Sequence, residues 1–440
     1  MSSLEQTVQL AIELLKKYNV SDYEISLGSS SGVSTAVRLG EVETLQYHLD
    51  KSFEINVFLG QKKGHASSVD LSKDSLNKTI ESACLIAKYT QDDPFNGLAP
   101  KELMAFDAPD LDLYHPWDLD AQHSINLAKE CEAIALEQSE IDNSEGAEVS
   151  SFQGEGLYAN SNGLIASQSS TRHSLNCSLI AKRDDDMQTA YEYTTALDAS
   201  TMQTPAQVGV KAAELAQEKL GARSLPSQKC PVIFTSRLSG GLFAQLLGAL
   251  GGSRQYKKST FLLNSIDQIV LPENLSLFEN PFVKKTLGAK AFDRDGVLKR
   301  EQYFVKDGRV CSYVMGQYSA NQLGLKTTAN AGGTNNVMIE ANFDGGLDEI
   351  IKDMGKGLVV TELMGQGVNA TTGDYSRGAL GFWVENGEIQ YPVSGLTIAG
   401  NLKDMLLGIV HVGNDVDQRS NMKVGSVLIK QMTIAGEANE

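Results

Sequence analysis

The chain has 440 residues, of which 41% are hydrophobic and 21% charged, so it is long enough for about three domains and apolar enough to bury a large core. Its 38 Lys and Arg residues face 55 Asp and Glu residues, and the net charge of −17 disfavours general binding to nucleic acid or anionic lipid. Five scattered cysteines without a C-x-x-C pair argue against a disulfide framework or a Cys-rich zinc module. Since no run reaches the roughly 18 apolar residues of a membrane span, we expect a soluble, cytoplasmic protein.

The first hundred residues predict a helix, several strands and a second helix. Ser3 and Gln6 have capping-box spacing ahead of an apolar helical stripe. Alternating apolar residues predict strands over 22–27, 33–38 and 52–59, and a second helical stripe follows from Leu76. The Asp-, Pro- and Gly-containing residues that follow this helix indicate a connector. We therefore expect an N-terminal α/β domain over 1–100.

The middle region predicts helices around a set of strands. A helical stripe near 127–135 precedes strand-like residues through 151–197. Thr204, Pro205 and Gln207 then have the positions of an N-cap, a first-turn proline and a capping-box partner. These elements predict a middle α+β domain over 101–222.

The remaining residues predict a β-rich C-terminal domain over 223–440. A buried strand over 230–235 and an apolar helix over 239–250 come first. Short β-rich runs then alternate with turns, and Asn386-Gly387 is a strong hairpin signal. The whole chain is therefore predicted to be α+β, with a largely antiparallel C-terminal half.

Common catalytic motifs give little support for an independent enzyme. The sequence contains no H-E-x-x-H, no P-loop and no convincing G-x-G-x-x-G. Residues 28–32 match G-x-S-x-G, but they lie between two predicted strands, so a hairpin loop is favoured over a nucleophilic Ser30. The six histidines lack the short spacing of a metal site, and His173 is interpreted as structural.

A basic segment stands out from the acidic chain. Residues 226–310 hold thirteen Lys or Arg residues against seven Asp or Glu residues. Within it, Arg254, Tyr256, Lys257 and Lys258 follow a Gly-rich helix end. Two interpretations stay open, an exposed polar loop or a cationic surface for an acidic peptide, a carboxylate or a partner subunit.

A glycine-rich stretch over 355–378 is the richest candidate for binding. Its six glycines allow close backbone approach, although plain β-turns explain them equally well. For its arginine, Arg377, the open roles are a partly exposed grip on a peptide carboxylate or a buried ion pair with Asp374 or Glu362. The polar candidates in this stretch are Glu362, Gln366, Asp374, Tyr375, Ser376 and Arg377.

At these residues the sequence resembles the TldD/PmbA family, and more closely its PmbA branch, also called TldE. The resemblance implies a cytosolic peptidase system in which a TldD-type and a PmbA-type subunit assemble. It also implies that this system processes unfolded or ribosomally made peptides, including precursors of antibiotic peptides. The segments that carry the resemblance are 64–72, 106–113, 170–174, 254–263, 357–378, 381–393 and 397–402.

The resemblance also places the family's metal site on one helix. The metal-binding subunit of the family carries H-E-x-x-x-H and a cysteine near its C-terminus. Ala244, Gln245 and Ala249 stand at the corresponding positions here, and no cysteine follows Cys311. Alanine offers no ligand and glutamine is no carboxylate base, so we expect no metal in this chain and zinc in a TldD-type partner.

The expected role is that of the non-metal partner subunit. We expect a homodimer through the C-terminal half when the chain is alone, and a hetero-oligomer with a TldD-type subunit. One alternative is an independent non-metal hydrolase that uses Asp374, Ser376 and Arg377. Another is a peptide- or nucleic-acid-binding regulator that uses residues 254–258, although the net charge makes nucleic acid unlikely.

Overall fold

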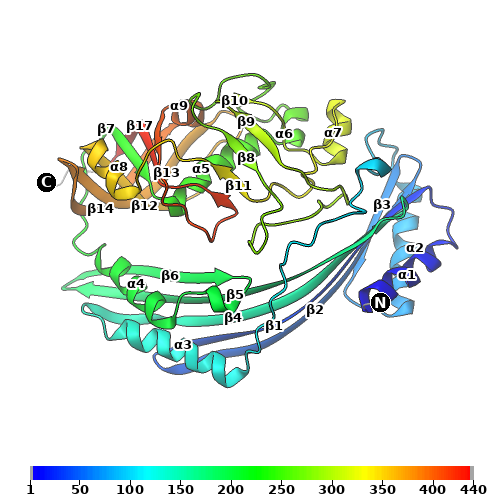
Figure 1. Cartoon of the computed structure of the whole chain (residues 1–440), viewed down its shortest axis with the longest axis horizontal. Coiled ribbons are helices and arrows are strands. Elements are labelled where there is room, and N and C mark those ends of the chain that lie inside the picture. Colours follow the sequence, from blue (N-terminus) through cyan, green and yellow to red (C-terminus); the bar gives the residue numbers. More distant parts are fainter. Residues whose placement is uncertain (1–2, 437–440) are drawn as a thin grey trace.

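The computed structural model describes residues 3–436, which form a long curved sheet facing a C-terminal lobe (Figure 1). We call the curved sheet the cradle sheet, and the C-terminal lobe comprises the elements from β7 onward. Helices and antiparallel-rich sheets occur throughout, which confirms the α+β prediction. No helix within the described residues combines the length and apolar character needed to cross a membrane.

The cradle sheet contains six antiparallel strands in the order β3-β2-β1-β4-β5-β6. It joins strands from both predicted domains before residue 222, because β1 pairs with β4 along most of its length. The division of the chain at residue 100 stays a prediction. The strands are β1 Asp22–Arg38, β2 Glu41–Leu59, β3 Lys62–Ser68, β4 Ile141–Asn160, β5 Ile165–Arg183 and β6 Asp186–Ala196.

The predicted hairpin loop at residues 28–32 is wrong, because these residues lie inside the continuous strand β1. Gly28 pairs with Ser52 on β2 and with Gly156 on β4, so the segment is hydrogen-bonded on both sides. At Gly32 a Cβ atom would lie 2.4 Å from the Phe152 ring, which explains the glycine by close packing within the sheet. The strand-to-helix elbow that a G-x-S-x-G nucleophile needs is therefore absent from this segment.

Two helix pairs cover the same face of the cradle sheet at its two ends. On β1, Ile25 and Leu27 pack under one pair, whereas Val33 and Val37 pack under the other. The predicted capping box of α4 is confirmed, with Thr204 and Gln207 each bonded to the other's backbone and Pro205 in the first turn. The pairs are α1 Ser3–Leu15 with α2 Lys73–Tyr89, and α3 Ala121–Leu136 with α4 Pro205–Gln217. Two 3-10 turns, η1 Lys101–Leu103 and η2 Ala199–Thr201, lie in the connections.

The C-terminal lobe contains two further sheets, of order β14-β13-β12-β7-β17-β15 and β10-β9-β8-β11-β16. The predicted hairpin at Asn386-Gly387 is confirmed, with positive φ at both residues between β13 and β14. The described strands of the lobe pair in antiparallel fashion except for the pairs β12–β7 and β11–β16.

The strands of the lobe are β7 Gln228–Phe234, β8 Leu277–Glu279, β9 Gln302–Lys306, β10 Arg309–Val310, β11 Val337–Ile339, β12 Gly357–Met364, β13 Asp374–Glu385, β14 Glu388–Asn401, β15 Ile409–Val412, β16 Met422–Lys423 and β17 Val427–Ala435. Its helices are α5 Ser236–Ala249, α6 Gly252–Tyr256, α7 Gln317–Leu323, α8 Leu347–Met354 and α9 Leu402–Leu407.

Candidate functional site

Helix α5 has one face in the core and the other face in a groove. Leu242, Phe243 and Leu246 are buried in the lobe, as expected of an apolar helix that follows a buried strand. The opposite face is rich in glycine and alanine and borders a cavity of about 540 Å³. Because Gly240, Gly241, Ala244 and Gly248 have short side chains or none, a ligand there can approach the helix backbone closely. The cavity is lined on α5 by Gly240, Gly241, Ala244, Leu247 and Gly248, and across from it by Val314, Gly333, Thr334, Ser420, Asn421 and Met422.

The three α5 positions implied by the family's metal motif do not fit a metal ion. Ala244 is exposed in the groove, Gln245 is half-buried and Ala249 is buried. Neither alanine has a donor atom, and an amide is a poor substitute for the imidazole and carboxylate groups of zinc sites. Within residues 3–436, no group of three or more His, Cys, Asp or Glu side chains is placed to hold a metal. The predicted apolar helix is therefore not buried on every side, since Ala244 faces the groove.

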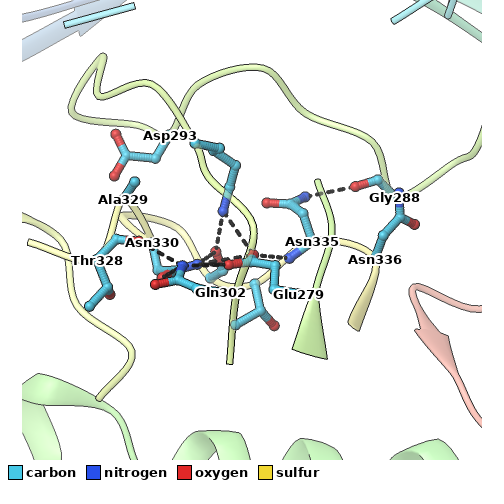
Figure 2. A network of polar contacts seen from close by, with 12 residues as sticks. Glu279, Gly288, Asp293, Gln302, Thr328, Ala329, Asn330, Asn335 and Asn336 are labelled. Carbon is cyan, nitrogen blue, oxygen red and sulfur yellow. Dashed lines mark hydrogen bonds and ion pairs between the residues drawn. The ribbon is translucent and has the colours of Figure 1, made fainter. Parts of the chain in front are cut away.

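A buried polar network supports the groove wall opposite α5 (Figure 2). Its centre is Glu279, which is fully buried and paired with Lys299 at 3.1 Å. Lys299 Nζ also donates to the carbonyl of Gly333 on the groove wall, at 3.3 Å. The other donors to the Glu279 carboxylate are Gln302 Nε2 at 2.8 Å, Asn330 Nδ2 at 3.0 Å and the Asn335 backbone N–H at 2.6 Å. A buried charge with this many partners fixes the loop over 327–336 in one conformation.

The α5 groove continues toward the cradle sheet. It shares Ser236 and Arg237 with a cavity of about 810 Å³, whose other walls include β6 and the loop over 415–419. Through Thr195, this second cavity adjoins a third of about 490 Å³ on the cradle sheet, lined by Phe152 and Arg172 among others. We call the three adjoining cavities the inter-lobe groove.

Charged residues bridge the two sides of the inter-lobe groove. Glu192 on β6 is buried, and its carboxylate accepts from Arg237 Nη1 at 3.0 Å and from Arg419 Nη1. Arg419 also binds both carboxylate oxygens of Asp417, at 2.9 Å each. The cradle sheet and the C-terminal lobe are thus joined by one acidic residue held between two arginines.

The same arginines lie over aromatic rings of β6. The guanidinium of Arg419 lies 4.3 Å from the Tyr193 ring centroid, and that of Arg237 lies 5.4 Å from the Tyr191 centroid. The two tyrosine rings stack at 6.3 Å. Tyrosine rings, which are apolar in the body and polar at the hydroxyl group, suit contacts with both the apolar and the polar parts of a peptide.

A further cavity of about 840 Å³ lies where the loop before β9 meets the cradle sheet, and it adjoins the inter-lobe groove through Leu197, Thr286 and Leu287. Three of its other lining residues are Glu24, Asp293 and Asp295. Burial first, and the neighbouring Asp295 carboxylate second, raise the pKa of Asp293 to about 7. Burial also raises the pKa of Glu24 and of Asp295. These carboxyl groups hold protons at a higher pH than ordinary carboxyl groups do.

The predicted cationic cluster lies outside the inter-lobe groove. Arg254 and Tyr256 belong to α6, and Lys257 and Lys258 to the turn after it, so the segment is a short helix and turn rather than an extended loop. All four side chains are exposed, and the Tyr256 ring contacts the edge of Phe95 in the connector at 5.6 Å. None of the four is among the described residues that line the three cavities.

The residues of the predicted glycine-rich stretch lie in different surroundings. Glu362 takes part in a contact with the cradle sheet, whereas Gln366 lies in an exposed loop. Glu362 on β12 forms an ion pair with Lys219, whose Nζ also donates to the Thr189 carbonyl of β6 at 2.7 Å. Glu362 therefore forms a second link between the lobe and the cradle sheet. Gln366 is exposed in the loop between β12 and β13.

Residues 374–377 begin strand β13. Asp374 is exposed, and hydrogen bonds from Thr372 and Asn401 lower the pKa of its carboxyl group. Ser376 is exposed, whereas Tyr375 is buried, and burial, opposed by Arg377, raises the pKa of the Tyr375 hydroxyl to about 12.

Arg377 is half-buried, and its Nη2 donates a long hydrogen bond to the Leu363 carbonyl at 3.5 Å. Among the described residues Arg377 forms an ion pair with neither Asp374 nor Glu362, so the second of its two open roles is not found there. The buried Nε atom of Arg377 has no hydrogen-bond partner among these residues.

Sequence reasoning missed the bridge formed by Glu192, Arg237, Asp417 and Arg419. Glu192 and Arg419 are 227 residues apart, so no local motif connects them. One feature of the sequence could have indicated the bridge. Glu192 stands at the same alternating strand positions as Ala190 and Thr194, and all three residues are buried on β6. A carboxylate at a buried strand position requires a cationic partner.

Comparison with known proteins gives a consistent match over the whole chain. Three models of the PmbA/TldA metallopeptidase family match, namely domain 1 over residues 23–87, the central domain over 114–220 and the C-terminal domain over 227–436. The chain is similar to Metalloprotease PmbA of Escherichia coli O157:H7, with 46% identity over 99% of this chain and 96% of that protein.

Solved structures share the fold. A putative modulator of DNA gyrase from Bacteroides thetaiotaomicron has a TM-score of 0.94 and 26% identity, covering 99% of this chain and 100% of that one. TldE from Thermococcus kodakarensis has a TM-score of 0.81 over 99% of this chain and 100% of that one, and its 20% identity indicates similarity of fold alone.

Proposed function

The chain belongs to the PmbA/TldD metallopeptidase family, and on that basis we propose that it is the subunit without a catalytic metal in a two-subunit peptidase. The resemblance drawn from the sequence is confirmed by the identity with Metalloprotease PmbA. The proposal is supported by helix α5, which has Ala244, Gln245 and Ala249 at the positions where the resemblance implies the family's ligands and base. A TldD-type partner would supply the metal and this chain would help to form the peptide chamber.

The inter-lobe groove supports a peptide as the ligand. Its α5 side offers backbone and small side chains, its middle offers Glu192, Arg237 and Arg419, and its cradle side offers Tyr191 and Tyr193. Main-chain groups, charged groups and aromatic rings in one groove suit an extended, unfolded polypeptide better than a compact ligand. The resemblance implies unfolded or ribosomally made peptides in the cytoplasm, and these are the proposed substrates.

The independent non-metal hydrolase gains no support from the arrangement of its candidate residues. Asp374 and Ser376 are exposed on β13, outside the lining of the inter-lobe groove. Arg377 has no carboxylate partner among the described residues. The candidate binding residues of the 254–258 and 362–377 segments stay proposals for contact with peptide or partner.

The test is co-purification of this chain with a TldD-type subunit, followed by metal analysis of each subunit after separation. The proposal expects zinc with the TldD-type subunit and none in stoichiometric amount with this chain. Failure of the two chains to associate, or zinc retained by this chain, would contradict it. Ala244→Ser is the control variant. It changes the groove face of α5 without adding an imidazole or a carboxylate, so the metal content of this chain should stay unchanged.

A further inference from the structure

The cavity of about 840 Å³ where the loop before β9 meets the cradle sheet, which we call the side cavity, is lined by cationic side chains without a counter-charge. Within residues 3–436, its Lys63 forms an ion pair with Glu24 at 3.9 Å. Its other cations, Arg172, Lys290 and Arg294, form no ion pair with any described carboxylate. In a chain of net charge −17, cations gathered in one cavity and left unpaired point to an anionic ligand.

Lys290 is the most enclosed of these unpaired cations. Its side chain is half-buried, whereas Arg172 and Arg294 are exposed. Burial first, and the cations of Arg294 and Lys299 next, lower the pKa of the Lys290 ammonium group, and the Asp293 carboxyl opposes them in part. An anion in the cavity would offset both costs, because a negative charge beside the ammonium group favours its charged form.

The carboxyl groups of the side cavity compete weakly for these cations. Glu24 accepts from the Tyr158 hydroxyl at 3.0 Å, Asp293 from three backbone N–H groups at 2.9–3.0 Å, and Asp295 from the first backbone N–H of α7 at 2.7 Å. Burial raises the pKa of all three carboxyl groups, so they carry less negative charge than ordinary carboxylates. Glu54 is exposed, where water screens its charge.

The turn that carries Arg294 is fixed to the groove wall. The Arg294 backbone N–H donates to the Ala331 carbonyl at 3.0 Å, and the Ala331 N–H donates to Asp293 at 2.9 Å. A Cβ atom at Gly332 would lie 2.9 Å from Arg294 Cδ, so the arginine stem lies directly against that glycine. Because Gly332 belongs to the loop that the Glu279 network holds, binding would cost little ordering of this turn.

The side cavity continues from the groove proposed to hold peptide. Leu197, Thr286 and Leu287 also line the groove part of about 810 Å³, and Arg172 also lines the part of about 490 Å³ on the cradle sheet. A peptide in the inter-lobe groove can therefore extend into the side cavity. The peptide group that ammonium and guanidinium groups bind most strongly is a carboxylate.

We propose that the side cavity binds a carboxylate of the peptide, with Lys290 and Arg294 as its cationic contacts. The favoured source is the C-terminal carboxylate, because a groove for unfolded peptides of varied sequence needs a group that every peptide carries. This assignment rests on the proposed function, since it concerns one end of the peptide in the inter-lobe groove. It gives the bound peptide a direction, with its carboxyl end in the side cavity and the preceding residues toward α5.

The test is fluorescence anisotropy with a short unstructured peptide that has an uncharged dye on its blocked N-terminus and no charged side chain. The peptide is added to this chain alone and to the joint preparation with a TldD-type subunit, with chelator present to prevent cleavage. The form with a free C-terminal carboxylate should bind at least about tenfold more tightly than the C-terminal amide. A third form, amidated and carrying one internal Asp, distinguishes the sources. Affinity equal to that of the free acid would keep the carboxylate site and assign it to acidic side chains.

Substitutions then test the two contacts. Lys290→Gln and Arg294→Gln should each remove most of the preference for the free acid, whereas Lys290→Arg should preserve it. Lys284→Gln is the matched control, because Lys284 is exposed on the same loop and lies outside the lining of the side cavity, so the preference should stay unchanged. Thermal melts check that each variant is folded. Lys290→Gln should not lower the melting temperature, since the ammonium group that it removes has no ion pair among the described residues.

The outcomes separate this inference from the proposed function. Equal affinity of the wild type for the acid and both amides would overturn the inference and leave the two-subunit peptidase standing. An acid preference that survives in folded Lys290→Gln and Arg294→Gln would also overturn it. Failure of all three peptides to bind would overturn it together with the peptide role of the inter-lobe groove. Co-purification and metal analysis decide the two-subunit proposal independently of these affinities.

Discussion

Glu192 on β6 and Arg419 in the loop before β16 form an ion pair that joins the cradle sheet to the C-terminal lobe. The carboxylate is buried and is shared with Arg237, so both arginines depend on it. Because the pair borders the inter-lobe groove, it fixes the spacing of the two surfaces that a peptide would contact.

Glu192→Gln should therefore destabilise the fold. The substitution keeps the side-chain shape but removes the charge that Arg237 and Arg419 share, and breaking a buried pair of this kind costs about 3–5 kcal/mol. Chemical denaturation should show this loss as a lower midpoint. The exposed pair of Lys211 and Glu214 provides the control, since Glu214→Gln should change the free energy of unfolding by less than about 1 kcal/mol. Equal effects for the two variants would contradict the bridging role.

Gly248 on α5 offers a test of the groove that does not damage the fold. A Cβ atom at this position would meet no other atom within 4 Å. Gly248→Ala should raise the free energy of unfolding by about 0.5–1 kcal/mol, because alanine favours the helix, and should preserve joint peptidase activity. Gly248→Leu should remain folded but lower that activity, because its side chain enters the cavity. Full activity of a folded Gly248→Leu complex would show that the groove does not carry peptide.

The fold was largely predictable where the signal is local. The capping residues Thr204 and Gln207 and the hairpin residues Asn386 and Gly387 each act over a few positions, and the structure confirms them. The strand over residues 28–32 was missed because Gly and Ser there favour turns, whereas pairing with β2 and β4 on both sides overrides that preference.

The site was less predictable, because its surfaces come from distant parts of the chain. Glu192, Arg237 and Arg419 meet only in the folded protein. The α5 positions could be found from the family's motif, but the exposure of Ala244 in a groove could not, since it depends on the loop that Glu279 and Lys299 hold in place.

Between about pH 4 and pH 7, the titration of three largely buried carboxyl groups should lower the free energy of unfolding as the pH rises. This pH dependence is the reverse of ordinary acid denaturation. Asp293 has a raised pKa of about 7 in the folded chain, and Glu24 and Asp295 also have raised pKa values. Between its unfolded and folded pKa values, each group binds more protons in the folded state, so its stabilising contribution is present below the unfolded pKa and is lost as the pH rises through the folded pKa.

Asp295→Asn should flatten this part of the melting profile. The amide oxygen can still accept the Gln317 backbone N–H, but the charge that raises the pKa of Asp293 is gone. Melting temperatures measured from pH 4 to 8 should fall less steeply than in wild type. Asp344→Asn, on the surface, controls for removal of one negative charge. An unchanged slope in Asp295→Asn would contradict the coupling of the two carboxyl groups.

Arg377→Ala should have a small effect on stability, below about 1 kcal/mol, because no carboxylate partner is lost and the contact with Leu363 is long. The pKa of Tyr375 should rise further, since the cation that favours its phenolate is removed, and Arg377→Lys should preserve it. Ultraviolet titration and thermal melting report the two quantities. A loss of about 3–5 kcal/mol would instead reveal a buried ion pair at Arg377.

The measurement that tests the central claim most directly is a peptidase assay on three preparations: this chain alone, a TldD-type subunit alone, and the two together. With an unstructured peptide as substrate, the account predicts no cleavage by this chain alone and cleavage by the joint preparation that a chelator abolishes. Cleavage by this chain alone, accompanied by one tightly held zinc ion that the chelator removes together with the activity, would contradict it.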